Sequence, residues 1–172
     1  MKKFVFITGG ARSGKSAFAL KLAGAFSSEG MVYVATAAPG DDEMKKRIAE
    51  HRAVRGPRWQ TIEAPVNLTA VITGANTAGV IVIDCLTLWI SNLMMNGRGD
   101  KDIISEAEAF FSACSANSAS VVIVSNEVGL SIVPENALAR RFRDVSGVVS
   151  QMAAKAASDA YICVAGIPLK LK

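Results

Sequence analysis

Short apolar runs alternate along this chain with longer segments in which apolar residues recur every three or four positions. The apolar runs predict strands at residues 3–8, 31–36, 79–87, 119–129 and 159–166. The runs at 79–87 and 119–129 are continuously apolar and end in polar residues, a pattern typical of strands that a parallel sheet buries on both faces. The chain is therefore expected to build a mostly parallel central sheet.

Helices are predicted between these strands. One follows the first strand at 15–26, and a second is expected in the segment DDEMKKRIAEHRA, residues 41–53, whose acidic start and basic continuation complement a helix dipole. After VPEN a long helix is predicted because one apolar stripe runs, at alternating spacings of four and three, through Leu138, Phe142, Val145, Val149, Met152 and Ala156. The alternation of strands and helices predicts a layered α/β domain with helices flanking the sheet.

The size and apolar content of the chain favour one globular domain. Its 172 residues suit a single buried core, so residues 1–172 are expected to form one domain. Although 51% of the residues are hydrophobic, no apolar run approaches the roughly 18 residues needed to cross a bilayer. The run in MKKFVFIT is ended by glycines too early for a secretory signal. These features predict a cytoplasmic protein without a membrane span.

Cysteine content and charge add little about partners. Cys85, Cys114 and Cys163 are widely separated and odd in number, which argues against a disulfide framework or a zinc site and predicts buried free thiols. The net charge of +4 is modest, and the basic residues lack the aromatic neighbours of a nucleic-acid surface. No nucleic-acid partner is therefore expected.

The sequence GGARSGKS meets the phosphate-loop rule between a predicted strand and a predicted helix. In such a loop the backbone N–H groups cradle the β-phosphate, the lysine ammonium bridges the β- and γ-phosphates, and the serine hydroxyl ligates Mg²⁺. The alternative is a tight glycine turn with an incidental Lys-Ser pair. The motif favours a P-loop NTPase (RecA-like) domain, in which the nucleotide would be bound by Gly9, Gly10, Ala11, Arg12, Ser13, Gly14, Lys15 and Ser16.

A phosphate loop needs an acidic partner for its metal ion at the end of a neighbouring strand. The run VIVID offers Asp84 in that position, so Ser16 and Asp84 are the predicted Mg²⁺ ligands. Asp84 could instead cap the helix that follows it, since aspartate is a favoured N-cap. Together the two motifs indicate a nucleoside triphosphate and Mg²⁺ but leave the acceptor open.

His51 is the only histidine of the chain. On a helix it would follow Met44 and Ile48 on or beside the apolar face, while four guanidinium groups surround it, those of Arg47, Arg52, Arg55 and Arg58. Guanidinium groups suit bidentate phosphate binding and disfavour imidazolium, which keeps the ring neutral. A neutral imidazole could displace pyrophosphate from an α-phosphate and carry the nucleotidyl group. A structural histidine is the alternative, and the spacing alone leaves both open.

Four motifs in order resemble one known family: TGGARSGKS, the segment from ATA through DDEMKKRIAEHR and RGPRW to TIEAP, VIVIDCLTLWISNLM, and SNEVGLSIVPENALARRFRDVSGVVSQ. This is the bifunctional adenosylcobinamide kinase/adenosylcobinamide-phosphate guanylyltransferase family of cobalamin biosynthesis. The resemblance runs from residue 4 to about residue 168. It implies phosphorylation of adenosylcobinamide by ATP or GTP. It further implies transfer of GMP from GTP, through a guanylylated histidine, to adenosylcobinamide phosphate, giving adenosylcobinamide-GDP.

The resemblance also implies roles for particular residues. The catalytic histidine of the family falls in Arg47–Arg52, where His51 is the candidate, and Lys15 serves the phosphates. The guanine-nucleotide contacts would map onto Thr36, Arg52, Ala53, Val54, Arg55, Glu63 and Asp84. A carboxylate such as Glu63 can accept hydrogen bonds from the N1–H and amine of guanine, although an exposed loop glutamate is the alternative. Asn126 and Glu127, at a strand end, would sense the γ-phosphate or activate the acceptor, or Glu127 would only order the next loop.

Some positions depart from the family pattern, and some questions stay open. Ser131 stands where glycine is usual and Ser150 where asparagine is typical, which bears on loop geometry.

A monofunctional small-molecule kinase and a nucleotide-gated regulatory protein are the two alternative functions. The resemblance implies a homo-oligomer, with a trimer as the expected form. The corrinoid is expected to bind between subunits.

Overall fold

The computed structural model describes residues 2–37 and 56–172. Its strands are β1 (Phe4–Gly9), β2 (Met31–Ala35), β3 (Trp59–Glu63), β4 (Val80–Asp84), β5 (Ser120–Val124), β6 (Asp159–Val164) and β7 (Ile167–Lys170). Its helices are α1 (Lys15–Phe26), α3 (Leu68–Gly74), α4 (Leu86–Met95), α5 (Asp100–Ala116) and α6 (Ala137–Ala156). In the ranges described, no helix is long and apolar enough to cross a membrane.

The seven strands form one sheet in the order β3-β2-β4-β5-β1-β6-β7. Every neighbouring pair is parallel except β6 and β7, which form an antiparallel hairpin. The predicted mostly parallel sheet is therefore confirmed. Because β5 lies between β1 and β4, the carboxyl ends of these three strands meet at one edge of the sheet.

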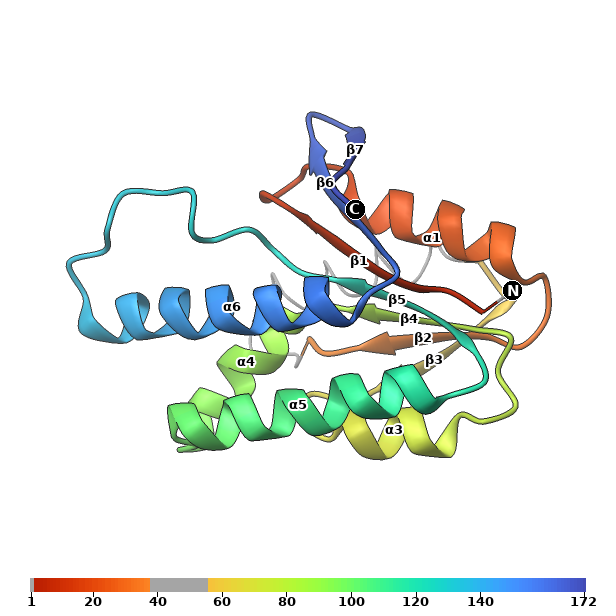
Figure 1. Ribbon diagram of the computed structural model, residues 1–172, viewed down its shortest axis with the longest axis horizontal. Coiled ribbons are helices and arrows are strands. Elements are labelled where there is room, and N and C mark those ends of the chain that lie inside the picture. Colours follow the sequence, from red (N-terminus) through yellow and green to blue (C-terminus); the bar gives the residue numbers. More distant parts are fainter. Residues whose placement is uncertain (1, 38–55) are drawn as a thin grey trace.

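Helices cover both faces of the sheet (Figure 1). Helix α1 packs on one face, where the small residues Ala19 and Ala23 lie fully buried against the apolar side chains of the central strands. Helices α3, α4, α5 and α6 cover the other face, where Trp89 and Phe110 are fully buried with ring centroids 5.7 Å apart. Fully burying one such large side chain stabilises the fold by roughly 1.5–3 kcal/mol. The larger of the two buried apolar clusters lies on this face, so it holds most of the core.

The sequence predictions differ from the structure mainly in strand length and in unpredicted elements. The predicted strands 79–87 and 119–129 shorten to Val80–Asp84 and Ser120–Val124, because helix α4 begins at Leu86 and the polar residues after Val124 leave the sheet. The strands β3 and β7 at the two sheet edges were not predicted, since edge strands carry weak hydrophobic runs and β7 is exposed throughout. The predicted helix at 41–53 lies within 38–55, outside the described residues. The three thiols are free and buried, as predicted.

Asp159 joins the two ends of the chain. Its carboxylate accepts hydrogen bonds from Lys170 Nζ at 2.6 Å and Lys3 Nζ at 3.0 Å, which ties β6 to β7 and to the residue before β1. Lys170 first, and then Lys3, lower the pKa of this carboxyl to about 2. The folded pKa thus lies below the unfolded value of about 4, so ionised Asp159 stabilises the fold above that value.

We expect this contribution to disappear in acid. The difference in unfolding free energy between the wild-type protein and Asp159→Asn should be constant near neutral pH and shrink as the pH falls from about 4 toward 2. Urea unfolding of both proteins at a series of pH values measures it. A difference that stays unchanged down to pH 2 would contradict the assigned pKa.

Candidate functional site

The loop of residues 9–16 leaves β1 and enters α1, where the sequence motif predicted it. Its glycines are required by close packing and by backbone conformation. A Cβ on Gly9 would lie 2.5 Å from the Cys163 carbonyl oxygen, and Gly14 has φ +87° with its missing Cβ only 3.0 Å from Gly166 Cα. A larger residue at either position would displace neighbouring backbone. The loop therefore depends on glycine for its shape.

The helix start beneath the loop suits an anion. Gly14 is the N-cap of α1 and provides no side-chain cap, and the first turn holds no acidic residue. The first N–H groups of a helix have no intrahelical acceptor, and the helix dipole makes this end partly positive. Ser16 is half-buried in this first turn. The geometry fits the phosphate chain of a nucleotide, as the motif predicted.

Lys15 is buried at the base of the loop. Its Nζ donates a hydrogen bond to the Gly10 carbonyl oxygen at 2.9 Å, so the ammonium group turns back under the loop. Burial raises the pKa of the Cys85 and Cys163 thiols, and the Lys15 ammonium partly offsets this effect on both. The lysine charge therefore lies near the carboxyl ends of both β4 and β6.

The turn between β6 and β7 supports the loop from behind. The Gly166 N–H donates a hydrogen bond to the Ser13 carbonyl oxygen at 3.0 Å, and Ala165 and Gly166 in this turn have φ values of +50° and +82°. These contacts connect residues about 150 positions apart, and the sequence motif did not reveal them. The C-terminal hairpin thus helps to hold the phosphate loop in place.

Asp84 stands at the carboxyl end of β4 and accepts a hydrogen bond from the Tyr33 hydroxyl at 2.8 Å. The N-cap of α4 is Cys85, without a side-chain cap, so the structure gives no support to the alternative that Asp84 caps this helix. Mg²⁺ prefers oxygen ligands and keeps several waters and phosphate oxygens in such sites. A half-buried carboxylate and the Ser16 hydroxyl fit that ligand chemistry, so both stay predicted Mg²⁺ ligands.

Thr36 links β2 to the end of β4. Its side-chain hydroxyl donates to the Cys85 carbonyl oxygen at 2.8 Å and accepts from the Cys85 N–H at 2.7 Å, and the residue is completely buried. Asn92 extends this network, because its Nδ2 donates to the carbonyl oxygens of Thr36 and Pro65. The Thr36 hydroxyl thus holds the backbone beside Asp84. Its predicted contact with the nucleotide stays a prediction.

We expect Thr36→Val to destabilise the protein by roughly 2–3 kcal/mol, because the change removes two hydrogen bonds and leaves the Cys85 N–H buried without an acceptor. Thr36→Ser keeps the hydroxyl and should lose far less. Urea unfolding of the three proteins measures the effect. Equal stability of wild type and Thr36→Val would show that the network contributes nothing to the fold.

Asn126 and Glu127 follow the end of β5. Asn126 Nδ2 donates to Thr87 Oγ1 at 2.8 Å, which joins this strand end to the start of α4. The Glu127 N–H donates to the Gly9 carbonyl oxygen at 2.9 Å, and its Oε1 accepts from the Gly129 and Leu130 N–H groups. These contacts support the interpretation that Glu127 orders the following loop. Roles for the pair in phosphate sensing or acceptor activation stay predictions.

The remaining predicted residues are only partly described. Glu63 is exposed at the last position of β3, beside Ala35 of β2, so it ends an edge strand rather than lying in a loop. Ser131 is not among the positive-φ residues, and its hydroxyl donates to the Val128 carbonyl oxygen at 3.1 Å, so serine fits this position without strain. His51 and the segment Arg52–Arg55 lie outside the described residues.

Two comparisons describe what this chain is similar to. The family model for cobinamide kinase/cobinamide phosphate guanyltransferase, CobU, matches residues 5–171. The bifunctional adenosylcobalamin biosynthesis protein CobU of Escherichia coli K12 is 40% identical over 181 residues, covering 98% of this chain and 99% of the relative. The bifunctional adenosylcobalamin biosynthesis protein CobP of Pseudomonas aeruginosa is 42% identical over 167 residues, with 96% and 95% covered.

Solved structures resemble the fold at low sequence identity. The flagellar accessory protein FlaH from Methanocaldococcus jannaschii superimposes with a TM-score of 0.57 and 14% identity, covering 99% of this chain and 78% of that one. The RadB recombinase does so with a TM-score of 0.52 and 16% identity, covering 93% and 73%. This likeness concerns the fold alone. It confirms the predicted layered architecture of a mostly parallel central sheet flanked by helices.

Proposed function

The chain belongs to the cobinamide kinase/cobinamide phosphate guanyltransferase family, and on that premise we propose which of its residues carry each reaction. It is a bifunctional enzyme of cobalamin biosynthesis that phosphorylates cobinamide and then transfers a guanylyl group to the resulting phosphate. The observation that carries this conclusion is the match of the family model over residues 5–171. We propose the adenosylated corrinoid as the acceptor form.

The kinase reaction is assigned to the loop of residues 9–16. The hydroxyl oxygen of the aminopropanol arm of adenosylcobinamide attacks the γ-phosphorus of ATP or GTP and gives up its proton to solvent. The bond from the γ-phosphorus to the β–γ bridging oxygen breaks, and the nucleoside diphosphate leaves. Lys15 and the N-terminal N–H groups of α1 stabilise the charge that builds up on the phosphates. Ser16 and Asp84 would hold Mg²⁺, which when bound neutralises phosphate charge.

The guanylyl transfer is assigned to His51. A ring nitrogen of the neutral imidazole attacks the α-phosphorus of GTP, pyrophosphate leaves, and the phosphate of adenosylcobinamide phosphate then displaces the histidine to give adenosylcobinamide-GDP. The assignment rests on His51 being the only histidine of the chain and on its place among arginines in the sequence. Glu63 at the end of β3 and the segment Arg52–Arg55 are proposed guanine-nucleotide contacts.

The two reactions are tested by their products. Purified protein with adenosylcobinamide, Mg²⁺ and ATP or GTP should form one nucleoside diphosphate per corrinoid phosphorylated. With GTP and adenosylcobinamide phosphate it should release pyrophosphate and form adenosylcobinamide-GDP. Nucleoside diphosphate without pyrophosphate would indicate a monofunctional kinase, and GTP binding without either product would indicate a regulatory protein.

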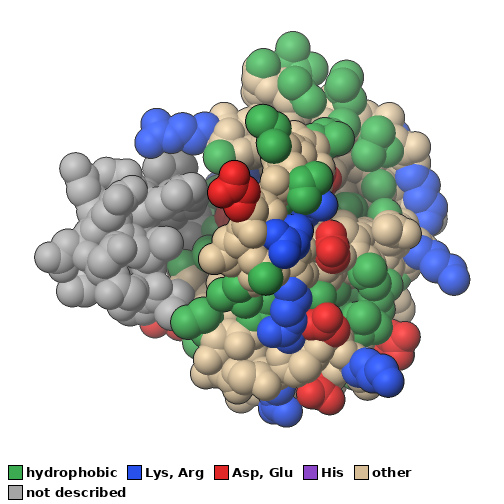
Figure 2. All heavy atoms as spheres, turned by 90° about the vertical axis from the view of Figure 1, so that its left-hand side faces the viewer, with side chains coloured by type: hydrophobic (Ala, Val, Ile, Leu, Met, Phe, Trp, Pro, Cys, Tyr) green, Lys and Arg blue, Asp and Glu red, His purple; other side chains and the backbone are tan. Residues whose placement is uncertain are grey.

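We also propose that the protein forms a homo-oligomer, with a trimer as the expected form. The loop between β5 and α6 is held by its own hydrogen bonds, yet it exposes Leu130, Ile132 and Val133 to 83%, 95% and 59%. Figure 2 shows the side of the molecule toward which this loop extends, with hydrophobic side chains in the open. Ordered apolar residues in water are typical of a contact surface. Light scattering measures the solution mass that tests this proposal.

A further inference from the structure

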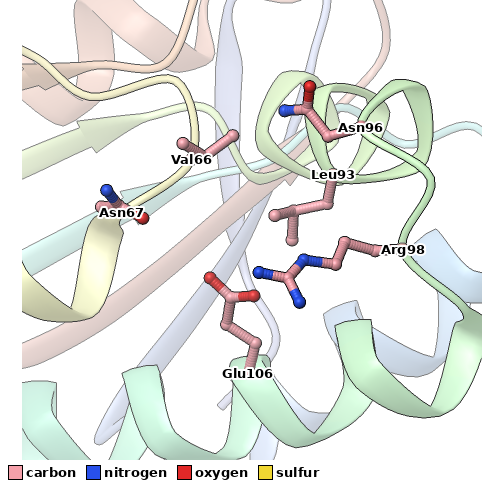
Figure 3. A pocket seen from close by; sticks show the side chains of 6 residues that line it. All are labelled: Val66, Asn67, Leu93, Asn96, Arg98 and Glu106. Atoms are coloured by element: carbon pink, nitrogen blue, oxygen red, sulfur yellow. The ribbon is translucent and has the colours of Figure 1, made fainter.

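A pocket of about 280 Å³ lies apart from the phosphate loop, between the start of α3, the end of α4 and the first half of α5. It is lined by Val66, Asn67, Leu93, Asn96, Arg98 and Glu106. In Figure 3 the guanidinium group of Arg98 and the carboxylate of Glu106 point toward each other across this space. In the part of the chain that the structure describes, however, no ion pair or hydrogen bond joins them. Two opposite charges therefore line the same pocket.

The position of Arg98 is built into the fold. The Arg98 N–H donates to the Leu93 carbonyl oxygen at 3.1 Å, and the Gly97 N–H donates to that of Met94 at 3.0 Å, with Gly97 at φ +78°. The Arg141 guanidinium on α6 donates in turn to the Arg98 carbonyl oxygen at 2.7 Å. The backbone that carries the guanidinium is thus held from two sides, while Glu106 projects from the regular helix α5.

The charges of the pocket restrict the kind of ligand it suits. The charges of Arg98 and Glu106 cancel, so the pocket favours neither a free anion nor a free cation. A neutral group with a carbonyl oxygen beside an N–H satisfies both, because the oxygen accepts from the guanidinium and the N–H donates to the carboxylate. The side chains of Val66 and Leu93 add apolar contact. Asn67, the N-cap residue of α3, makes no capping hydrogen bond with its side chain and adds an amide at the rim.

We propose that this pocket binds a neutral amide edge of a substrate, held between Arg98 and Glu106. The proposal rests on the proposed function, because the corrinoid carries such edges in its carboxamide arms and GTP carries one in the lactam edge of guanine. If guanine is the ligand, Glu106 takes the place assigned above to Glu63 as acceptor of the N1–H. The pocket is well placed for either. Val66 follows the carboxyl end of β3. Asn92, next to Leu93, donates a hydrogen bond to the carbonyl oxygen of Thr36, the residue after β2. The pocket therefore lies near the carboxyl ends of β2 and β3, at the same edge of the sheet as Asp84 at the end of β4.

Equilibrium binding of adenosylcobinamide, GTP and ATP tests the proposal without requiring turnover. Glu106→Ala and Arg98→Ala should each raise the Kd of one ligand by about 10-fold or more, the effect expected for losing a hydrogen bond to a charged group. Glu106→Gln keeps an acceptor and should show a smaller effect. Glu108→Ala, an exposed position on the same helix, is the matched control.

The outcomes separate the two sources of the amide edge. Weaker adenosylcobinamide binding with unchanged GTP binding indicates a carboxamide arm, and weaker GTP binding with unchanged ATP binding indicates guanine. Variants that match Glu108→Ala for all three ligands, or that lose ATP and GTP affinity in step, overturn the proposal. A wild-type protein that binds these ligands but forms no product contradicts the proposed function alone.

Discussion

Replacing Lys15 by alanine is expected to lower both reactions by about 10²–10³-fold, the usual effect of removing one preorganised donor to a transferring group. The lysine ammonium lies under the phosphate loop, with Nζ 2.9 Å from the Gly10 carbonyl oxygen, where it can move to bound phosphate oxygens. Its loss affects both half-reactions if both use this loop. Steady-state rates of nucleoside diphosphate and pyrophosphate release measure the two effects separately.

Lys21→Ala is the matched control for this experiment. Lys21 lies on the same helix α1 but is exposed to solvent, so its loss should leave both rates within a factor of two or three of wild type. Because Lys15 is buried, thermal unfolding of both variants checks that the fold is retained. A Lys15→Ala protein that is folded and keeps full kinase activity would exclude the loop as the phosphoryl-donor site.

Replacing His51 by alanine is expected to abolish guanylyl transfer while kinase turnover stays measurable. The imidazole is the proposed nucleophile, so without it no covalent guanylyl intermediate can form, whereas the γ-phosphate is handled by the loop of residues 9–16. Incubation with GTP labelled in the α-phosphate should give the wild-type protein a label that is acid-labile and alkali-stable, as expected of a phosphoramidate. The variant should take up none.

The kinase assay serves as the internal control for His51→Ala. If both activities fall equally while the protein remains folded, the proposed division between the phosphate loop and His51 is wrong. If the variant still becomes labelled, another nucleophile carries the guanylyl group. Lys15→Ala and His51→Ala should therefore give different patterns, one lowering both reactions and the other removing only the second.

Local sequence patterns predicted the parts of the site that are continuous in the chain. The loop of residues 9–16 and its position between β1 and α1 follow from a motif in which each glycine has a local backbone role. Asp84 was placed at a strand end because a continuously apolar run stops there. The central strands were predicted for the same reason, although their ends were extended by up to five residues, into the start of α4 after β4 and into a polar segment after β5.

Edge elements and long-range supports were not predictable in this way. Strand β3 alternates weakly and β7 is exposed at all four positions, so neither has the continuous apolar run of a buried strand. The hydrogen bond from Gly166 to Ser13 joins backbone groups, which leave no signature in residue type. Thr36 was assigned to the nucleotide from the family pattern, whereas its side-chain hydroxyl is bonded to the backbone of Cys85, 49 residues away.

The sequence alone therefore determined the alternation of strands and helices, the phosphate loop and the family, because these depend on residues close together in the chain. Only the tertiary structure decided which strand ends meet, how the C-terminal hairpin supports the loop, and that Arg98 and Glu106 face each other across a pocket. Such contacts follow from the order of strands in the sheet. That order is selected by the packing of the whole core, which no single segment encodes.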